Sequence, residues 1–190
     1  MDATALIASL QDALPGVGLE TSPSLDLQPT IYAPAGHLIG VALALRDRDD
    51  LRFDALMEVT AVDVWPREPR FELVYTLLST VHRHRMRLKV RLDGSEAHVA
   101  TLSTIWPAAN WLEREVWDLF GIVFDGHPDL RRLLMPEDWE GHPLRKDYPV
   151  QIRMTPRTGE PLQVTAEEFR ANLAKDRLSR GGQGRQGRQE

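Results

Sequence analysis

Apolar and polar residues alternate with a period of two in the middle of the chain, a pattern that is typical of strands with one buried face. The longest such runs cover residues 71–78 and 86–92, and shorter ones cover residues 61–65 and 98–105. A sheet with one solvated face is usually antiparallel. A further strand is predicted for the apolar run 37–45, which ends in a charged turn.

Apolar residues at helical spacing predict three helices. The first covers residues 3–14, and the second, capped by Asp50 or Asp54, extends to Thr60. The third begins at Asn110. Together these elements predict an α+β fold: a two-layer sandwich of a mainly antiparallel or mixed sheet with helices on one face, followed by an extended C-terminal arm.

The third helix carries start and stop signals. Asn110 precedes Glu113 by the spacing of a capping box, and Gly121 suits the left-handed position that ends a helix. An apolar stripe faces the predicted core and consists of Trp111, Leu112, Val116, Leu119 and Phe120.

Periodicity is lost from Val123 onward, where turn residues dominate. We therefore predict an α+β domain over residues 1–122 and an arm over residues 123–178 that is ordered by packing on another surface. One more helix is predicted over residues 165–178. Residues 179–190 form a low-complexity segment rich in Gly, Gln and Arg, and they are predicted to be a disordered tail.

Composition and charge narrow the function classes. The 190 residues include 42% hydrophobic and 27% charged positions with a net charge of −5, so broad nucleic-acid binding is not expected. The chain has no cysteine, which excludes a thiolate-held zinc or iron–sulfur site within it. The first 14 residues lack the features of a secretory signal, and the run 38–45 is too short to span a membrane. We expect a cytoplasmic protein that meets a membrane only through a partner.

The most specific pattern lies in residues 106–149, WPAANWLEREVWDLFGIVFDGHPDLRRLLMPEDWEGHPLRKDYP. Its elements are E-R-E at 113–115, D-L-F-G-I at 118–122, F-D-G-H-P-D-L-R-R-L-L at 124–134 and E-G-H-P-L-R-K-D-Y-P at 140–149. This pattern resembles the signature of the 30-kilodalton subunit family, also called the C subunit family, of respiratory complex I, the proton-translocating NADH:quinone oxidoreductase. The resemblance covers roughly residues 35–150.

The resemblance implies a non-catalytic scaffold in the peripheral arm of such a complex, on the cytoplasmic side of the inner (plasma) membrane. It implies contacts with the large quinone-site subunit and with cluster-bearing subunits. FMN and iron–sulfur clusters are expected in those partners, and no cofactor or metal is expected in this chain. The same domain occurs in related membrane-bound hydrogenases and in photosynthetic and archaeal complexes, so donor and quinone stay open. The signature residues, which the resemblance marks as a subunit interface, are Glu113, Arg114, Glu115, Asp118, Phe120, Gly121, Gly126, His127, Pro128, Asp129, Leu130, Arg131, Arg132, Trp139, Gly141, His142, Pro143, Arg145, Lys146, Asp147 and Tyr148.

The acidic residues of the third helix have two interpretations. Near a helix N-terminus they favour the helix dipole, and Arg114 is spaced to pair with Asp118. Alternatively, Glu113 and Glu115 act as general acid and base, but residues two apart on a helix point in different directions. We favour a structural or interface role.

His127 and His142 offer an alternative function, a small metal-dependent hydrolase in which Asp129 or Glu140 completes the metal site. Each histidine stands between Gly and Pro, so a hydrogen bond within a turn is the preferred interpretation. The histidines of the 82–84 loop are interpreted as solvated. No Gly-rich phosphate loop, G-x-S-x-G or H-E-x-x-H motif occurs in the chain.

The basic residues of the arm alternate with acids, which favours intrachain ion pairs and subunit contacts over nucleic-acid binding. These basic residues are Arg131, Arg132, Arg145 and Lys146. Trp139 and Tyr148 are interpreted either as core residues or as interface anchors. A third function hypothesis, that the arm lines part of a quinone channel, is not separable from scaffolding by sequence.

Overall fold

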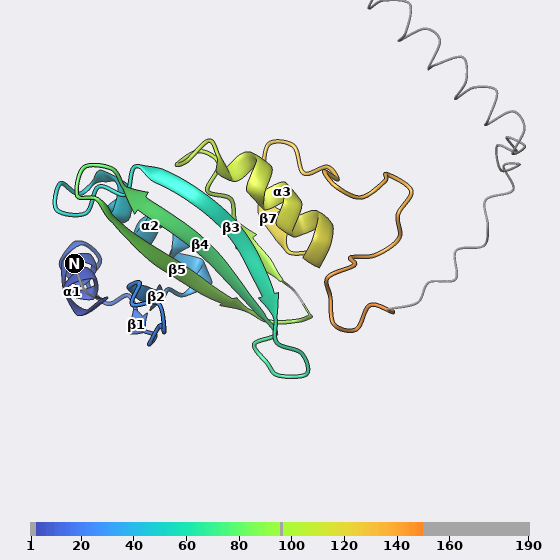
Figure 1. The fold of residues 1–190 in the computed structure, drawn as a ribbon, viewed down its shortest axis with the longest axis horizontal. Helices are drawn as coiled ribbons and strands as arrows, with labels where there is room; N and C mark the ends of the chain where they lie inside the picture. Colours follow the sequence, from blue (N-terminus) through green and yellow to red (C-terminus); the bar gives the residue numbers. More distant parts are fainter. Residues whose placement is uncertain (1–2, 96, 150–190) are drawn as a thin grey trace, which may run out of the picture. The chain divides into compact units, whose positions relative to one another are not determined.

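The computed structural model describes residues 3–95 and 97–149, and Figure 1 shows their arrangement. In chain order the elements are α1 (Ala3–Ala13), β1 (Glu20–Thr21), β2 (Thr30–Tyr32), the 3-10 helix η1 (Ala35–His37), α2 (Leu38–Asp47), β3 (Ala55–Asp63), β4 (Phe71–Ser79), β5 (His84–Leu92), β6 (His98–Ala100), α3 (Ala109–Phe120) and β7 (Val123–Asp125). Across these residues, no helix combines the length and apolar character that crossing a membrane requires. The predicted helix 165–178 and tail 179–190 lie outside the described residues.

Strands β1 to β5 form one mixed sheet in the order β1-β2-β5-β4-β3. The three long strands are antiparallel, and Tyr75 at their centre lies opposite Leu88 on β5 and Val59 on β3. Strand β2 runs parallel to β5, with Ile31 opposite Leu88, and β1 is antiparallel to β2. The predicted mainly antiparallel or mixed sheet is therefore confirmed.

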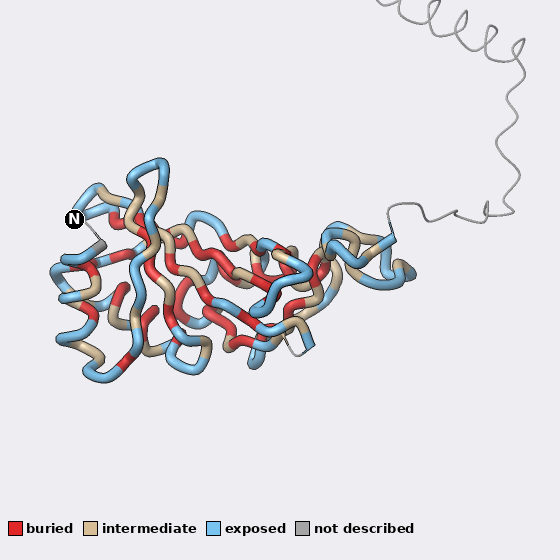
Figure 2. The backbone as a smooth tube through the Cα atoms, turned by 90° about the horizontal axis from the view of Figure 1, so that it is seen from below, coloured by how far each residue is buried: buried red, intermediate tan, exposed pale blue. Residues whose placement is uncertain are grey.

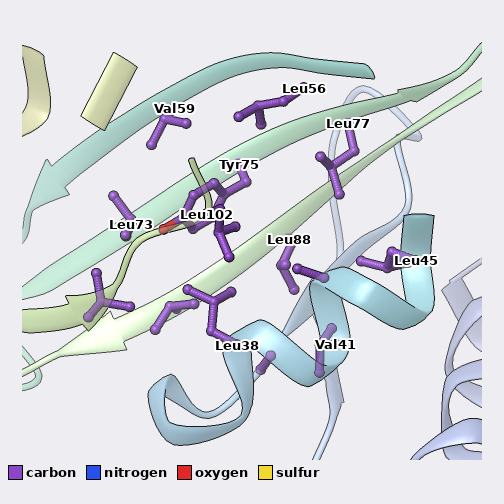
Figure 3. Close-up of a cluster of buried hydrophobic side chains, with 14 of the residues drawn as sticks. Leu38, Val41, Leu45, Leu56, Val59, Leu73, Tyr75, Leu77, Leu88 and Leu102 are labelled. Carbon is purple, nitrogen blue, oxygen red and sulfur yellow. The ribbon is translucent and has the colours of Figure 1, made fainter. Parts of the chain in front are cut away.

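The hydrophobic core lies on one face of this sheet, as the period-two pattern predicted. The inward residues of β4, which are Phe71, Leu73, Tyr75 and Leu77, are all fully buried. Figure 3 shows Leu38, Val41 and Leu45 of α2 in the same buried cluster as Leu88 of β5. The opposite face is polar, with Lys89 and Glu72 paired at 3.1 Å, so helices cover one face only.

The strand predicted over residues 37–45 is wrong, because this segment forms helix α2. Its buried residues Leu38, Val41, Ala42 and Leu45 follow helical spacing, while Ile39 is half exposed. A short apolar run does not distinguish a buried strand from a helix by periodicity alone. Packing of this stripe on the sheet decided in favour of the helix.

The second predicted helix is also wrong, because residues from Ala55 onward form strand β3. The pairing register shifts between Leu56 and Glu58, which marks a bulge. At a bulge one strand has an extra residue, so Met57 and Glu58 are both exposed and the alternation is broken. The resulting apolar spacing imitates a helix.

Helix α3 ends as predicted and begins differently. Gly121 adopts the left-handed conformation (φ 75°) and donates its N–H to the carbonyl of Trp117. The predicted capping box at Asn110 is wrong, because the helix begins at Ala109 without a side-chain cap. The predicted strand 98–105 stops at Ala100, where the short parallel pair with β7 ends and a turn begins.

Residues 126–149 follow β7 as a long segment without helix or strand, which we call the strap. Figure 2 shows the strap as tan and pale blue, since none of its described residues is fully buried. Residues 1–149 nevertheless form one compact unit. The strap is therefore tied to the domain by polar contacts at its surface more than by hydrophobic burial.

Candidate functional site

Asp118 of α3 is the centre of the first attachment of the strap. Its buried carboxylate accepts backbone N–H groups from three successive residues, Leu133 at 3.0 Å, Leu134 at 2.8 Å and Met135 at 2.8 Å. The other carboxylate oxygen accepts a 2.6 Å hydrogen bond from Arg132. Burial alone would raise the pKa of Asp118, but these donors outweigh it and lower the pKa. The carboxylate therefore stays ionised and fixes this turn.

Arg132 extends the attachment along the strap. Besides its ion pair with Asp118, it donates to the carbonyls of Trp139 at 2.8 Å and Gly141 at 3.2 Å. Its guanidinium lies 5.8 Å from the ring centre of Trp117. One planar cation therefore joins helix α3 to two places in the strap, a role that a single lysine amine fills poorly.

His142 lies where α3 ends. Its Nδ1–H donates to the carbonyl of Asp118 at 3.0 Å, and the backbone N–H of Leu144 donates to the carbonyl of Leu119 at 3.0 Å. The strap thus supplies donors to carbonyls that the end of a helix leaves without partners. A Cβ on Gly121 would lie 2.5 Å from the His142 ring, so a glycine is needed both for the left-handed turn and for this close approach.

A second attachment joins the strap to the β3–β4 hairpin. Arg70, just before β4, forms hydrogen bonds of 3.0 and 2.8 Å with Asp63 and of 2.9 and 2.6 Å with Asp147. Asp63 also accepts the backbone N–H of Lys146 at 2.8 Å. Burial would raise the pKa of Asp63, but the Arg70 hydrogen bonds and backbone donors outweigh it and bring the pKa to about 2.

Sequence reasoning missed Arg70 and Asp63. The available signal was the position of Asp63, which occupies an inward position of the period-two pattern where an apolar residue is expected. A carboxylate at such a position needs a buried cationic partner. Lys146 takes part through its backbone, so its predicted role in the cationic cluster is not seen as a side-chain ion pair.

Glu113 is fully buried and lies beyond the first turn of α3, so the dipole interpretation is wrong for it. Its carboxyl accepts the backbone N–H of Leu102 at 2.8 Å and lies 2.5 Å from the Thr101 hydroxyl. Burial raises the pKa of Glu113 to about 7, against the lowering effect of these hydrogen bonds. Glu115 is only partly buried, and the two carboxyls point to different surroundings as predicted.

Arg114 does not form the predicted ion pair with Asp118. Its Nε donates to the carbonyl of Arg131 at 3.1 Å and its Nη2 to the carbonyl of Arg132 at 3.3 Å. The guanidinium lies 5.0 Å from the ring centre of the exposed Trp111. Both oxygens of Asp118 are already bound by Arg132 and the 133–135 backbone, and Arg114 donates to carbonyls of the strap instead.

The two histidines make the turn hydrogen bonds that the sequence favoured. His127 donates from Nε2 to the carbonyl of Asn110 at 3.0 Å, and its Nδ1 accepts the backbone N–H of Asp129 at 3.1 Å. His142 is engaged with Asp118 as described above. Across residues 3–95 and 97–149, no group of three or more His, Asp or Glu residues is arranged to hold a metal ion.

Of the two histidines predicted to be solvated, His82 is exposed as predicted, whereas His84 is partly buried at the start of β5. His82 is hydrogen-bonded to the carbonyl of Asp49 at 2.9 Å and stacks on His84 with ring centres 5.6 Å apart. The ring of His84 also packs edge-on against Phe53 at 5.1 Å. Burial lowers the pKa of His84, which favours its neutral form in this packing.

Predicted intrachain ion pairs are confirmed along the strap. Arg131 pairs with Asp129 at 2.6 Å, and Arg145 pairs with Asp147 at 3.6 Å. Gly126 (φ 77°) and Gly141 (φ 79°) are turn positions. The remaining signature residues are packing or surface positions of α3 and the strap: Phe120, Pro128, Leu130 and Pro143.

Trp139 and Tyr148 are neither core residues nor isolated. Their rings stack with centres 6.5 Å apart, and the Tyr148 hydroxyl donates to the carbonyl of Glu140 at 3.0 Å. Among the described residues, the buried indole N–H of Trp139 has no hydrogen-bond partner. The two stacked rings lie near the C-terminal end of the strap, and in the described part of the chain the donor without an acceptor is the indole N–H of Trp139.

The fold has counterparts among solved structures. A trypsin-resistant fragment of Nqo5 matches with a TM-score of 0.53 and 26% identity, covering 68% of this chain and all of the fragment. A chain of the membrane-bound sulfane sulfur reductase, an archaeal respiratory membrane complex, matches with a TM-score of 0.65 and 26% identity over 77% of this chain and 85% of that one. Both share the fold.

The family follows from the sequence comparisons. Residues 31–153 match the family described as the respiratory-chain NADH dehydrogenase 30 Kd subunit, and the chain belongs to that family. It is 48% identical over 151 residues to the C subunit of the NADH-quinone oxidoreductase of Roseiflexus castenholzii, covering 79% of this chain and 86% of the relative. It is 44% identical over 149 residues to the corresponding NADH-quinone oxidoreductase subunit of a Caulobacter strain, covering 74% of this chain and 68% of that protein.

Proposed function

We propose that this chain is the C subunit of an NADH-quinone oxidoreductase and acts as a scaffold in its peripheral arm. The observation that carries the proposal is the 48% identity to a relative of that name over most of both chains. Electron transfer from NADH to quinone is then a property of the whole complex. The isolated chain is proposed to have no activity.

The chemistry of the described residues supports a scaffold. Buried charges hold the strap in place: Asp118 of α3 binds Arg132 and the 133–135 backbone, and Asp63 of β3 binds the backbone of Lys146. A chain without cysteine supplies no thiolate for an iron–sulfur cluster. FMN and the clusters are therefore proposed to reside in partner subunits, chiefly cluster-bearing subunits next to the large quinone-site subunit.

The exposed side of the strap is the proposed contact with these partners. The side chain of Arg131 is 75% exposed, and the partly exposed ring of Trp139 stacks on Tyr148 at the end of the strap. Aromatic residues and Arg dominate the energetics of protein interfaces. We place the chain on the cytoplasmic side of the membrane, attached through the complex.

The test is purification of the tagged chain from its native membranes in mild detergent, followed by a native gel with an NADH-oxidation stain and mass spectrometry. The proposal expects co-migration with an active complex that contains cluster-bearing subunits. A species at the mass of this chain alone, in a detergent that keeps the rest of the complex intact, would contradict it.

Substitutions separate scaffolding from catalysis. Arg131→Glu and Trp139→Ala are expected to lower the amount of assembled complex and leave turnover per complex unchanged. Arg85→Glu, a charge reversal at an exposed position of β5, is the matched control. Normal assembly with lower turnover per complex would show a direct part in electron transfer instead.

A further inference from the structure

An open groove of about 460 Å³ lies between the outer side of α3 and the strap. Its apolar lining comes from Trp111, Trp117 and Leu130, and its charged lining from Arg114, Arg131 and Arg132, with Glu137 as the one acidic member. Trp111 is 60% exposed although it is a large aromatic residue on a helix. The groove therefore combines indole surface with an excess of positive charge.

Arg114 is the unusual member of this lining. Arg131 and Arg132 are each paired with a carboxylate, Asp129 and Asp118. Arg114 is only 8% exposed, and in the part of the chain that the structure describes its hydrogen bonds go to neutral backbone carbonyls. Asp129 acts on it only through space, because both of its carboxylate oxygens are held by Arg131.

A largely buried guanidinium without its own carboxylate is costly, and it is stabilised when an anion completes the pair. The guanidinium stacks on Trp111, so an anion that reaches it also brings its neighbouring atoms onto the indole face. Nε and Nη2 of Arg114 each donate to a strap carbonyl, so the N–H groups of Nη1 and the second N–H of Nη2 are the donors left for a carboxylate.

We propose that this groove receives an extended segment of a neighbouring subunit that presents an acidic residue beside an apolar one. The carboxylate pairs with Arg114, and the apolar side chain covers Trp111 and Leu130. This inference rests on the proposed function and specifies the chemistry of one contact within it.

Charge distinguishes this occupant from two others. Residues 150–190 of the same chain carry a net positive charge, with eight Arg and Lys against five Asp and Glu, so their overall charge matches the lining of the groove less well than an acidic segment does. They include Glu168 beside Phe169, and a cross-link to this chain is therefore an outcome that the test below must separate. A second copy of the chain docking the same face would bring like-charged arginines together. An acidic segment from a different subunit satisfies the charge and the apolar surface at once.

The direct test places a photoreactive phenylalanine derivative at position 111 in the tagged chain and irradiates the purified complex. The same residue at position 65 is the control, because Trp65 is also an exposed tryptophan (54%) and does not line the groove. The expected result is a cross-link from position 111 to one segment of another subunit with an Asp or Glu next to an apolar residue.

Several results would overturn the proposal while the complex is intact. These are a cross-link from position 111 only to this chain, to a second copy or to lipid, a cross-link to a segment without an acidic residue, or a yield no higher than at position 65. If the unsubstituted chain is absent from the purified complex, the proposed function is contradicted, and the groove proposal, which rests on it, is contradicted too. The two failures are therefore distinguishable.

Substitutions give an independent measurement, the fraction of the chain that stays in the complex as NaCl rises. Trp111→Glu, which places a carboxylate in the groove, is expected to lower retention about tenfold at the salt concentration where half of the unsubstituted chain is retained. Trp111→Phe, which keeps an aromatic surface, is expected to lower it less than threefold. Arg114→Gln keeps side-chain donors for the strap carbonyls and is expected to flatten the salt dependence. Equal effects of the two Trp111 variants would contradict the proposal.

Discussion

Arg70 and Asp147 are 77 positions apart in the sequence and share two hydrogen bonds of 2.9 and 2.6 Å. The same guanidinium holds Asp63, so one side chain joins the start of β4, the end of β3 and the end of the strap. The strap therefore supplies one of the two carboxylates that pair with Arg70. Substitutions at the attachments of the strap should affect the stability of the whole described unit.

Arg70→Ala is expected to destabilise the fold by about 3–5 kcal/mol, because it leaves the buried carboxylate of Asp63 without its cation. Asp147→Asn removes a partner that is 47% exposed and should cost about 1 kcal/mol or less. Urea unfolding of the full chain, followed by tryptophan fluorescence, measures both. Equal losses for the two variants would show that Asp63 does not depend on Arg70.

The Asp63 ion pair also predicts acid sensitivity. Its pKa is about 2 in the fold and 3.8 ordinarily, so its stabilisation is fully present above about pH 4 and is lost as the pH falls toward 2. The contribution amounts to about 2 kcal/mol. Stability measured between pH 5 and pH 2 should fall less steeply for Asp63→Asn, from a lower starting value. A parallel decline in both proteins would mean that other carboxylates govern acid unfolding.

Glu113 predicts the opposite pH dependence. Burial raises its pKa from 4.5 to about 7, so the fold favours the protonated acid and its stability decreases as the pH rises from about 4.5 to 7. The decrease attributable to this group is about 3 kcal/mol. Glu113→Gln should remove it, and the stability profiles of the two proteins, determined by urea unfolding at each pH, should differ most at and above pH 7.

The hydrogen bonds around Glu113 agree with a protonated acid. The Thr101 hydroxyl lies within bonding distance of both Glu113 and the Ser103 hydroxyl at 2.9 Å, but it has one proton to donate. A protonated Glu113 donates to Thr101, and Thr101 can then donate to Ser103. Because the Thr101 hydrogen bond lowers the pKa of Glu113, Thr101→Val should raise that pKa further and destabilise the turn at Leu102. A fall in that pKa would indicate that Thr101 stabilises the protonated acid more than the ionised form.

Asp118→Ala is expected to release the strap. It removes the acceptor for three backbone N–H groups and for Arg132, and loss of one partner from a buried charge pair costs about 3–5 kcal/mol. Limited digestion with trypsin should then cut after Arg131 and Arg132 at least tenfold faster than in the unsubstituted chain. Glu115→Ala, on a partly exposed position of the same helix, is the control.

Gly121→Ala tests the contact between α3 and the strap. The left-handed conformation costs a residue with a side chain about 1–2 kcal/mol, and the added Cβ overlaps the ring of His142. We expect a loss of thermal stability together with faster exchange of the Leu144 amide, which donates to the end of α3. Gly36→Ala is the control, since a Cβ added at Gly36 would meet nothing within 4 Å.

Sequence reasoning found the elements whose pattern is local. The alternation in β4 and β5 and the glycine end of α3 follow from neighbouring residues and were predicted correctly. The bulge in β3 and the burial of α2 depend on contacts with other elements. The apolar spacing of these two segments therefore predicted the wrong type of element. The signature residues identified α3 and the segment that packs on it. The hydrogen bonds of Asp118 with Arg132 and with the backbone of residues 133–135 could not be predicted, because these groups are not adjacent in the chain.

The parallel pairing of β2 with β5 has a consequence for synthesis on the ribosome. Ile31 leaves the ribosome well before Leu88, the residue that it lies opposite in the sheet. Strand β2 therefore has no neighbour in the sheet other than the two-residue β1 until β5 has been made and has paired with β4. Such long-range pairing forms slowly. The N-terminal segment, although translated first, should be among the last parts of the domain to become protected.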